Sequence, residues 1–142
     1  MSNKRFWWSV IAVWAVLWVT DFLFHGVWLG ELYQQTAQYW RPRSEMMHYA
    51  PLMWVGNFIF AWAFVWIYSK GISKGNLWSQ AFRYGLAIIG VSKINALTAT
   101  FASSPYPMEI IWKWALIWTV QAWLCAFVMT LTFNPKAAWA KN

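Results

Sequence analysis

The sequence has little of what stabilises a soluble domain of its size. Only 11% of its 142 residues are charged, whereas soluble domains carry about 25%. Its single cysteine, Cys125, excludes an internal disulfide and any site built from several cysteines. Disorder is excluded too, because disordered chains are poor in aromatic residues and this one contains fifteen Trp, ten Phe and six Tyr. An integral membrane protein is the class that remains.

Long apolar runs are what the sequence has instead. A helix needs about 20 mostly apolar residues to cross a bilayer, and four stretches approach that length: residues 6–29, 51–68, 81–101 and 110–133. We therefore predict an all-α integral membrane protein whose single domain, residues 1–142, contains four transmembrane helices. The longest connection contains Arg41-Pro42-Arg43, which interrupts any continuing helix. The first run is too long for a signal peptide and is interpreted as a retained span.

The basic residues are divided unevenly between the two ends of these helices. Three lie on one side, namely Arg41, Arg43 and Lys113, and seven on the other, namely Lys4, Arg5, Lys70, Lys74, Arg83, Lys136 and Lys141. Short cytoplasmic loops carry the excess of Lys and Arg. We therefore predict that both termini are cytoplasmic, in a bacterial inner membrane. The net charge of +7 then reflects topology, and no nucleic-acid partner is expected.

Ionisable groups share one face of the first helix. Trp14, Trp18, Asp21 and His25 follow at helical spacing. Charges that face lipid cost several kcal/mol, so such groups turn inward and find partners. We predict a buried polar cluster of Asp21, His25, Asn57, Lys93, Asn95 and Gln121, in which Asp21 pairs with Lys93 and His25 lies toward the outer side. The cluster would either lock helices together, which we favour, or form a proton or cation pathway.

The same spacing recurs 100 residues later, where Trp114, Trp118 and Gln121 correspond to Trp14, Trp18 and Asp21. An ancient duplication and a chance match of two Trp-rich helices both explain this.

Glycines and tryptophans indicate where the helices meet other surfaces. Gly26 and Gly30 form a small-xxx-small pair that lets another helix approach closely. Trp is normally enriched at the two membrane interfaces, but five tryptophans fall toward the middle of the spans: Trp14, Trp18, Trp62, Trp66 and Trp118. We interpret them as a surface covered by partner subunits, or by lipid and flat cofactors. A surface that faces only lipid is the alternative.

The two histidines are the candidate ligands. His25, followed by Gly26, could be an axial ligand of a haem or pigment. His48 lies beside Met46 and Met47, whose sulfur atoms suit copper. Structural roles are commoner for both, so we predict no metal and no cofactor, and expect bound lipid. No nucleophile, paired-carboxylate or phosphate-loop motif is evident, and we do not expect an enzyme.

The segment from Asp21 to Met46 has a distinctive pattern. It reads Asp21-Phe22-Leu23-Phe24-His25-Gly26-Val27-Trp28-Leu29, then Leu32-Tyr33, Thr36-Ala37, Trp40-Arg41-Pro42 and Glu45-Met46. This pattern resembles a family of small bacterial four-span membrane proteins of unknown function. The resemblance implies the same four-helix architecture and a Trp40-Arg41-Pro42 loop that folds back over the outer end of the bundle. It supplies no activity and no catalytic residue.

Small size, short loops and an aromatic surface favour a non-catalytic accessory subunit of a larger inner-membrane complex, respiratory or otherwise energy-converting, that contacts partner subunits and lipids. The alternative is a small four-span proton-coupled transporter that acts as an oligomer. It would use Asp21 as its first-helix carboxylate. Lys93 is a departure from that class, because it would repel a cationic substrate.

Overall fold

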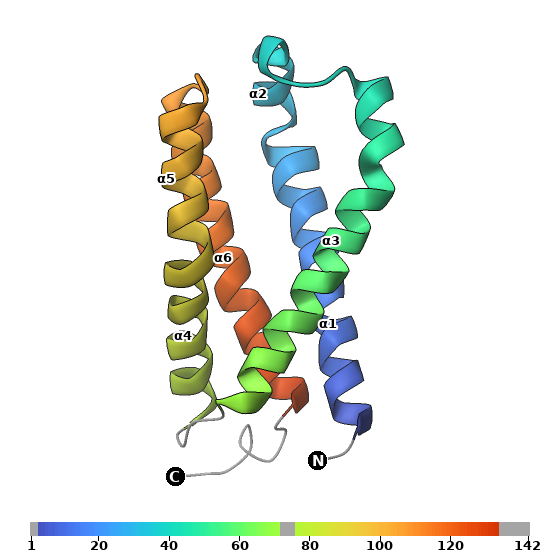
Figure 1. Ribbon diagram of the computed structural model, residues 1–142, viewed down its shortest axis with the longest axis vertical. Coiled ribbons are helices and arrows are strands. Elements are labelled where there is room, and N and C mark those ends of the chain that lie inside the picture. Colours follow the sequence, from blue (N-terminus) through green and yellow to red (C-terminus); the bar gives the residue numbers. More distant parts are fainter. Residues whose placement is uncertain (1–2, 72–75, 134–142) are drawn as a thin grey trace.

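The computed structural model describes residues 3–71 and 76–133, and every regular element within those ranges is a helix. The elements in chain order are α1 (Asn3–Asp21), the π-helical η1 (Phe22–Trp28), α2 (Gly30–Gln35), the 3-10 turn η2 (Ala37–Tyr39), α3 (Arg43–Lys70), α4 (Leu77–Ile88), the π-helical η3 (Ile89–Lys93), α5 (Ile94–Ser103) and α6 (Met108–Phe133). Elements α4, η3 and α5 together form one long helix (Figure 1).

Four helices are long and apolar enough to cross a membrane. They run over Lys4–Trp28, Arg43–Lys70, Leu77–Ser103 and Met108–Phe133, and have 25 to 28 residues each. At about 1.5 Å of rise per residue each exceeds the roughly 30 Å hydrocarbon core of a bilayer. The predicted fold class, an all-α protein with four membrane-spanning helices, is confirmed, and the chain is a multi-pass membrane protein.

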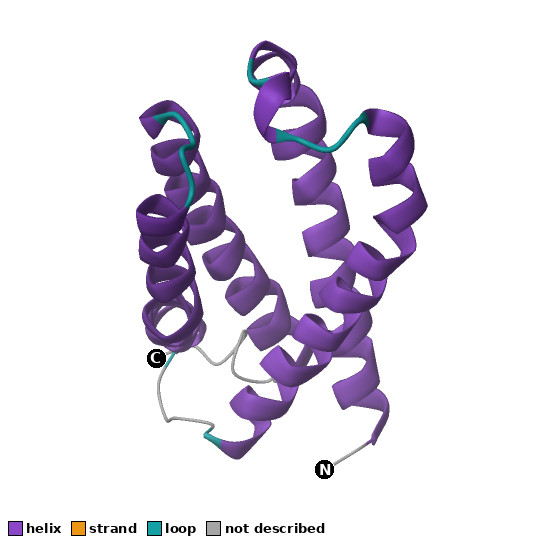
Figure 2. Cartoon of the chain, turned by 45° about the horizontal axis from the view of Figure 1, so that its top comes forward, coloured by secondary structure: helices purple, strands orange, loops and turns teal. Residues whose placement is uncertain are grey.

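The spans alternate in direction. The start of α1 and the end of α6 lie at one end of the bundle, here called the lower end, and α2 lies at the upper end with the turn between α5 and α6 (Figure 1). Toward the upper end α3 diverges from the pair formed by α5 and α6 (Figures 1 and 2). The upper half of α3 is accordingly exposed along almost its whole length.

The second span begins earlier than the sequence predicts. Pro42 has extended backbone (ψ 145°) and ends the preceding segment, but α3 starts directly after it, at Arg43, and Pro51 lies inside the helix. Proline lacks the N–H for one helical bond. A break at this point would leave still more backbone groups unpaired in a membrane. Continuing the helix through Pro51 therefore costs less free energy than ending it there.

The start of the third span is set by a side-chain cap. Asn76 Oδ1 accepts a hydrogen bond from the backbone N–H of Ser79 at 2.8 Å, which satisfies one of the free donors at a helix start. The span therefore begins at Leu77 rather than at residue 81.

The apolar core lies between the lower halves of the four long helices. Its buried members are Val10, Val13, Leu17, Ala61, Phe64, Val65, Tyr68, Ala81, Ile88, Cys125, Ala126, Met129 and Phe133. Lipid tails are as apolar as these side chains, so close packing and polar contacts must hold the helices together. Polar contacts of this kind link the lower halves: Tyr68 donates to Gln80 Oε1 at 2.7 Å, Thr132 donates to Ser9 Oγ at 2.8 Å, and the Tyr84 hydroxyl donates to the carbonyl of Phe64.

The close helix approach occurs at Gly85 and not at the glycines predicted for it. A Cβ at Gly26 would meet only Phe22 of its own helix, at 3.5 Å, and one at Gly30 would meet nothing within 4 Å. At Gly85 of α4 a Cβ would lie 2.3 Å from Cδ1 of Trp123 on α6. The prediction for Gly26 and Gly30 is wrong within this chain, because a Cβ at either glycine would meet no other described helix.

Candidate functional site

Asp21 stands where three helices meet, directly above the apolar core. Its carboxylate accepts a hydrogen bond from Asn57 Nδ2 of α3 at Oδ2 (2.9 Å) and another from Gln121 Nε2 of α6 at Oδ1 (2.6 Å). Each carboxylate oxygen therefore has one amide donor, and α1 is tied to both of its neighbours at one point. We call Thr20, Asp21, Asn57 and Gln121 the polar junction.

Thr20 completes the junction. The Gln121 amide carries two N–H donors, and its second one goes to Thr20 Oγ1 at 2.8 Å. The Thr20 hydroxyl in turn lies 2.7 Å from the carbonyl of Val16 in its own helix. The 100-residue correspondence of Asp21 with Gln121 is thus also a direct contact between α1 and α6.

Two predicted members of the cluster lie elsewhere. The expected Asp21–Lys93 ion pair is wrong, because the ion pairs among the described residues are Arg41–Glu45 and Glu109–Lys113. The Lys93 ammonium instead lies over two aromatic rings, 5.0 Å from the centroid of Phe60 and 5.3 Å from that of Trp118. Asn95 is exposed on α5, away from the junction.

His25 belongs to a second polar chain, toward the upper end. Tyr33 of α2 lies 2.6 Å from His25 Nδ1, and the Tyr33 oxygen accepts the indole N–H of Trp114 at 2.8 Å. Which group donates in the His25–Tyr33 contact depends on which imidazole nitrogen carries the proton, since the Tyr33 oxygen can accept from both Trp114 and a protonated Nδ1.

Tyr33 is held in an aromatic cluster at the upper end. Burial raises its pKa above the ordinary value of 10.0; the hydrogen bond from Trp114 partly opposes this, and the Asp21 charge adds to it. Trp40 stacks on Tyr106 (5.0 Å between centroids) and also contacts the rings of Tyr33 and Trp114. Of the Trp40-Arg41-Pro42 loop, Trp40 thus contacts the upper end of α6, whereas Arg41 is exposed and pairs with Glu45 of α3.

The side chains of Met46, Met47 and His48 do not point toward a common position where they could bind one metal ion. Met46, Met47 and His48 are exposed and consecutive on α3, and consecutive helical residues point about 100° apart. His48 packs edge-on against Tyr49, with centroids 5.3 Å apart. Within residues 3–71 and 76–133 no group of three or more His, Cys, Asp or Glu side chains could hold a metal.

The five predicted surface tryptophans divide into two sets. Trp18, Trp62 and Trp66 are exposed, whereas Trp14 and Trp118 are half-buried: Trp14 packs against the apolar core and Trp118 stacks on Trp114. These last two present only part of their rings to the outside. Trp66 lies four residues from the end of α3, at the level where an interfacial indole is ordinary. Trp54, which no sequence pattern singled out, contacts Trp18 on the outside.

Sequence reasoning missed Thr20, Tyr33 and Trp114. Thr20 is one residue from Asp21 and Trp114 shares the stripe of Gln121, so proximity and helical spacing are the signals that could have found them. Both π-helical segments adjoin ionisable residues: η1 follows Asp21 and contains His25, and η3 ends at Lys93. Such segments are frequent at functional sites.

Comparison of the chain with protein-family models, curated proteins and solved structures finds no match. A functional assignment therefore depends on the geometry of the chain alone.

Proposed function

We propose that this chain is a non-catalytic accessory subunit of a larger complex in a bacterial inner membrane. The observation that carries the proposal is an exposed pair of indoles on α1 and α3. Trp18 and Trp54 have ring centroids 5.3 Å apart and are 42% and 46% exposed. Trp18 lies ten residues, or roughly 15 Å, before the end of its span at Trp28, below the level where Trp is enriched, and its ring contact places Trp54 beside it.

The chemistry of this pair favours a protein neighbour over lipid. Neither indole N–H donates a hydrogen bond within the described part of the chain. A polar group without a partner in hydrocarbon costs free energy, because lipid tails contain no acceptor. A partner helix that supplied a carbonyl or hydroxyl oxygen would remove that cost.

The polar junction has a structural role in this proposal. Asn57 and Gln121 hold Asp21 from two helices, and interhelical hydrogen bonds in membranes contribute about 0.6 to 2 kcal/mol each. They would keep α1 and α3 in the register that presents Trp18 beside Trp54. The lower end, with Lys4, Arg5 and Lys70, would face the cytoplasm.

Native sizing of mild-detergent extracts tests the proposal. We expect the wild-type chain to migrate with heavier polypeptides, and the Trp18→Leu, Trp54→Leu double variant to migrate alone. Trp8→Leu is the matched control, because Trp8 is also an exposed indole of α1 (66%) but lies near the lower end. A wild-type chain that migrates alone, or only with copies of itself, contradicts the proposal.

A proton-coupled transporter acting as an oligomer is the second candidate. The observation that favours it is Asp21, a carboxylate within a span that is held by two neutral amides and has no basic side chain at ion-pair distance among the described residues. Asp21→Asn would abolish proton-coupled uptake by a transporter but leave a subunit assembled.

A further inference from the structure

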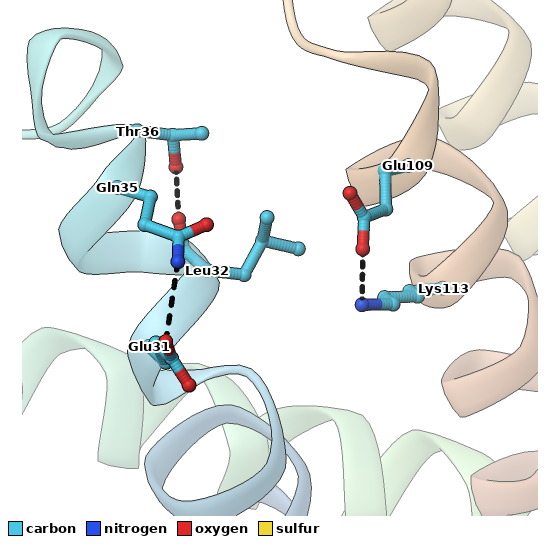
Figure 3. A network of polar contacts seen from close by, with 6 residues as sticks. All are labelled: Glu31, Leu32, Gln35, Thr36, Glu109 and Lys113. Atoms are coloured by element: carbon cyan, nitrogen blue, oxygen red, sulfur yellow. Dashed lines mark hydrogen bonds and ion pairs between the residues drawn. The ribbon is translucent and has the colours of Figure 1, made fainter.

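Two lysines of this protein occupy nearly the same kind of aromatic setting. Lys113 lies 5.7 Å from the ring centroids of both Trp28 and Trp112. Lys93 lies 5.0 Å from the ring of Phe60 and 5.3 Å from that of Trp118. The difference is an anion: Lys113 has Glu109 at 2.6 Å (Figure 3), and no carboxylate of the described residues occupies the corresponding place at Lys93.

The acidic side chains of the sequence cannot fill that place. There are four of them, all within the described residues. Glu45 pairs with Arg41, Glu109 pairs with Lys113, and Glu31 accepts from Gln35 at 3.2 Å. Asp21 is bonded to Asn57 and Gln121, and attracts Lys93 only from beyond ion-pair distance. A side-chain carboxylate that pairs with Lys93 would therefore have to come from another molecule.

We propose that Lys93, together with the rings of Phe60 and Trp118, binds the carboxylate of a small apolar organic acid that enters from the bilayer. Lys93, Phe60 and Trp118 are all half-buried, so each of the three side chains keeps part of its surface open to a ligand. The carboxylate would lie on the ammonium, and the two rings would contact the apolar body of the acid.

The depth of Lys93 in the membrane favours a small apolar acid over a phospholipid headgroup as the ligand. Lys93 lies about ten residues, or roughly 15 Å, from the upper end of its helix at Ser103. Lipid phosphates stay at the interface, whereas a small acid with one charged group can reach this depth if a cation receives it. The charge of Lys93 also explains why an anion fits here and an organic cation does not.

Fluorine NMR of the purified full chain in zwitterionic nanodiscs tests the proposal, with a trifluoromethyl-substituted alkylbenzoic acid as the probe. We expect saturable binding at one site, and about tenfold or greater weakening in Lys93→Met, because a charge-assisted hydrogen bond is lost. Lys93→Arg, which keeps the charge, should retain binding and guards against a folding defect in Lys93→Met. Lys113→Met is the matched control and should bind as the wild type does.

Three results would overturn the proposal. The first is no saturable binding to the wild-type chain, as expected if a partner subunit supplies the anion. The second is equal weakening by Lys93→Met and Lys113→Met, or saturable binding of the corresponding neutral alcohol with the same affinity. The third is loss of the bound acid when anionic phosphatidylglycerol replaces half of the nanodisc lipid, which would identify a headgroup site.

Discussion

The Asp21 carboxylate is held by neutral amides rather than by a cation, and this determines which substitutions it tolerates. Both of its oxygens depend on donors from other helices. Removing one donor leaves a polar oxygen unsatisfied above an apolar core, and the cost of an unmade bond exceeds the net gain of a made one. At the scale of single residues, the partners of Asp21 therefore matter as much as Asp21 itself.

Gln121→Leu should lower the free energy of unfolding by about 1 to 3 kcal/mol, because both Asp21 and Thr20 lose a donor. Denaturant unfolding in mixed micelles measures the change. Gln34→Leu, at an exposed position of α2, is the control and should have little effect. Equal effects of the two substitutions would show that the junction does not stabilise the bundle.

Tyr33 should remain protonated at a pH where an ordinary tyrosine ionises. Burial raises its pKa above 10.0, so the folded state binds this proton more tightly than the unfolded state does. Its contribution to stability is complete below pH 10 and falls as the pH rises through the folded pKa. Ultraviolet titration of wild type minus Tyr33→Phe gives that pKa.

Replacing Trp114 tests the cause of this shift. The Trp114 N–H stabilises the ionised form of Tyr33, so Trp114→Phe should move the Tyr33 pKa still higher. A Tyr33 midpoint at or below 10, or a downward shift in Trp114→Phe, would contradict the geometry described for this hydroxyl.

Helical spacing predicts part of the site correctly. It fails for Lys93 and Asn95 because a π-helical segment changes the spacing there. Asn57 and Gln121 do meet Asp21, because regular α-helix precedes each of them in its span. Lys93 and Asn95 lie in or after η3, where the turns contain an extra residue. The extra residue rotates the side chains that follow it about the helix axis. A prediction that assumes 3.6 residues per turn therefore assigns them to the wrong face of the helix.

At the scale of elements, the contact of α4 with α6 depends on a missing side chain. Gly85 leaves the space that the Trp123 ring fills, and Phe82 stacks on the same ring at 5.5 Å. The sequence signal for such contacts, a pair of small residues four apart, pointed to Gly26 and Gly30. The face of a helix that meets a neighbour depends on how the whole bundle packs. A pair of small residues in the sequence carries no information about that packing.

Gly85→Ala should destabilise the protein by about 1 to 3 kcal/mol, because the new methyl group would displace the Trp123 ring. Gly56→Ala is the control: it also lies in a long helix, and a Cβ there meets nothing within 4 Å. Trp123→Leu should relieve the defect when combined with Gly85→Ala. Denaturant unfolding of the four variants measures this, and equal stability of the two alanine variants would refute the contact.

Helix existence was predictable and helix length was not. Each predicted span corresponds to an observed one, because long apolar runs have no other stable state in lipid. The second span is longer than the apolar run at residues 51–68 by one polar segment, Arg43–Ala50. Composition identifies the part of a helix inside hydrocarbon, but a helix can extend beyond it.

At the scale of the whole molecule, the distribution of charge predicts a direction across the membrane. The lower end should face the cytoplasm. In a Cys125→Ser background, Gln38→Cys at the upper end and Gly71→Cys at the lower end are matched exposed positions. A membrane-impermeant maleimide should label Gln38→Cys in intact cells and Gly71→Cys only after permeabilisation. The reverse pattern would invert the proposed topology.

The central claim is that another protein covers Trp18 and Trp54, and photo-cross-linking from position 54 in the native membrane tests it most directly. A benzophenone amino acid in place of Trp54 should attach to a polypeptide other than this chain, whereas the same probe in place of Trp8 should attach mainly to lipid. Adducts from position 54 with lipid alone, or only with a second copy of this chain, would contradict the account.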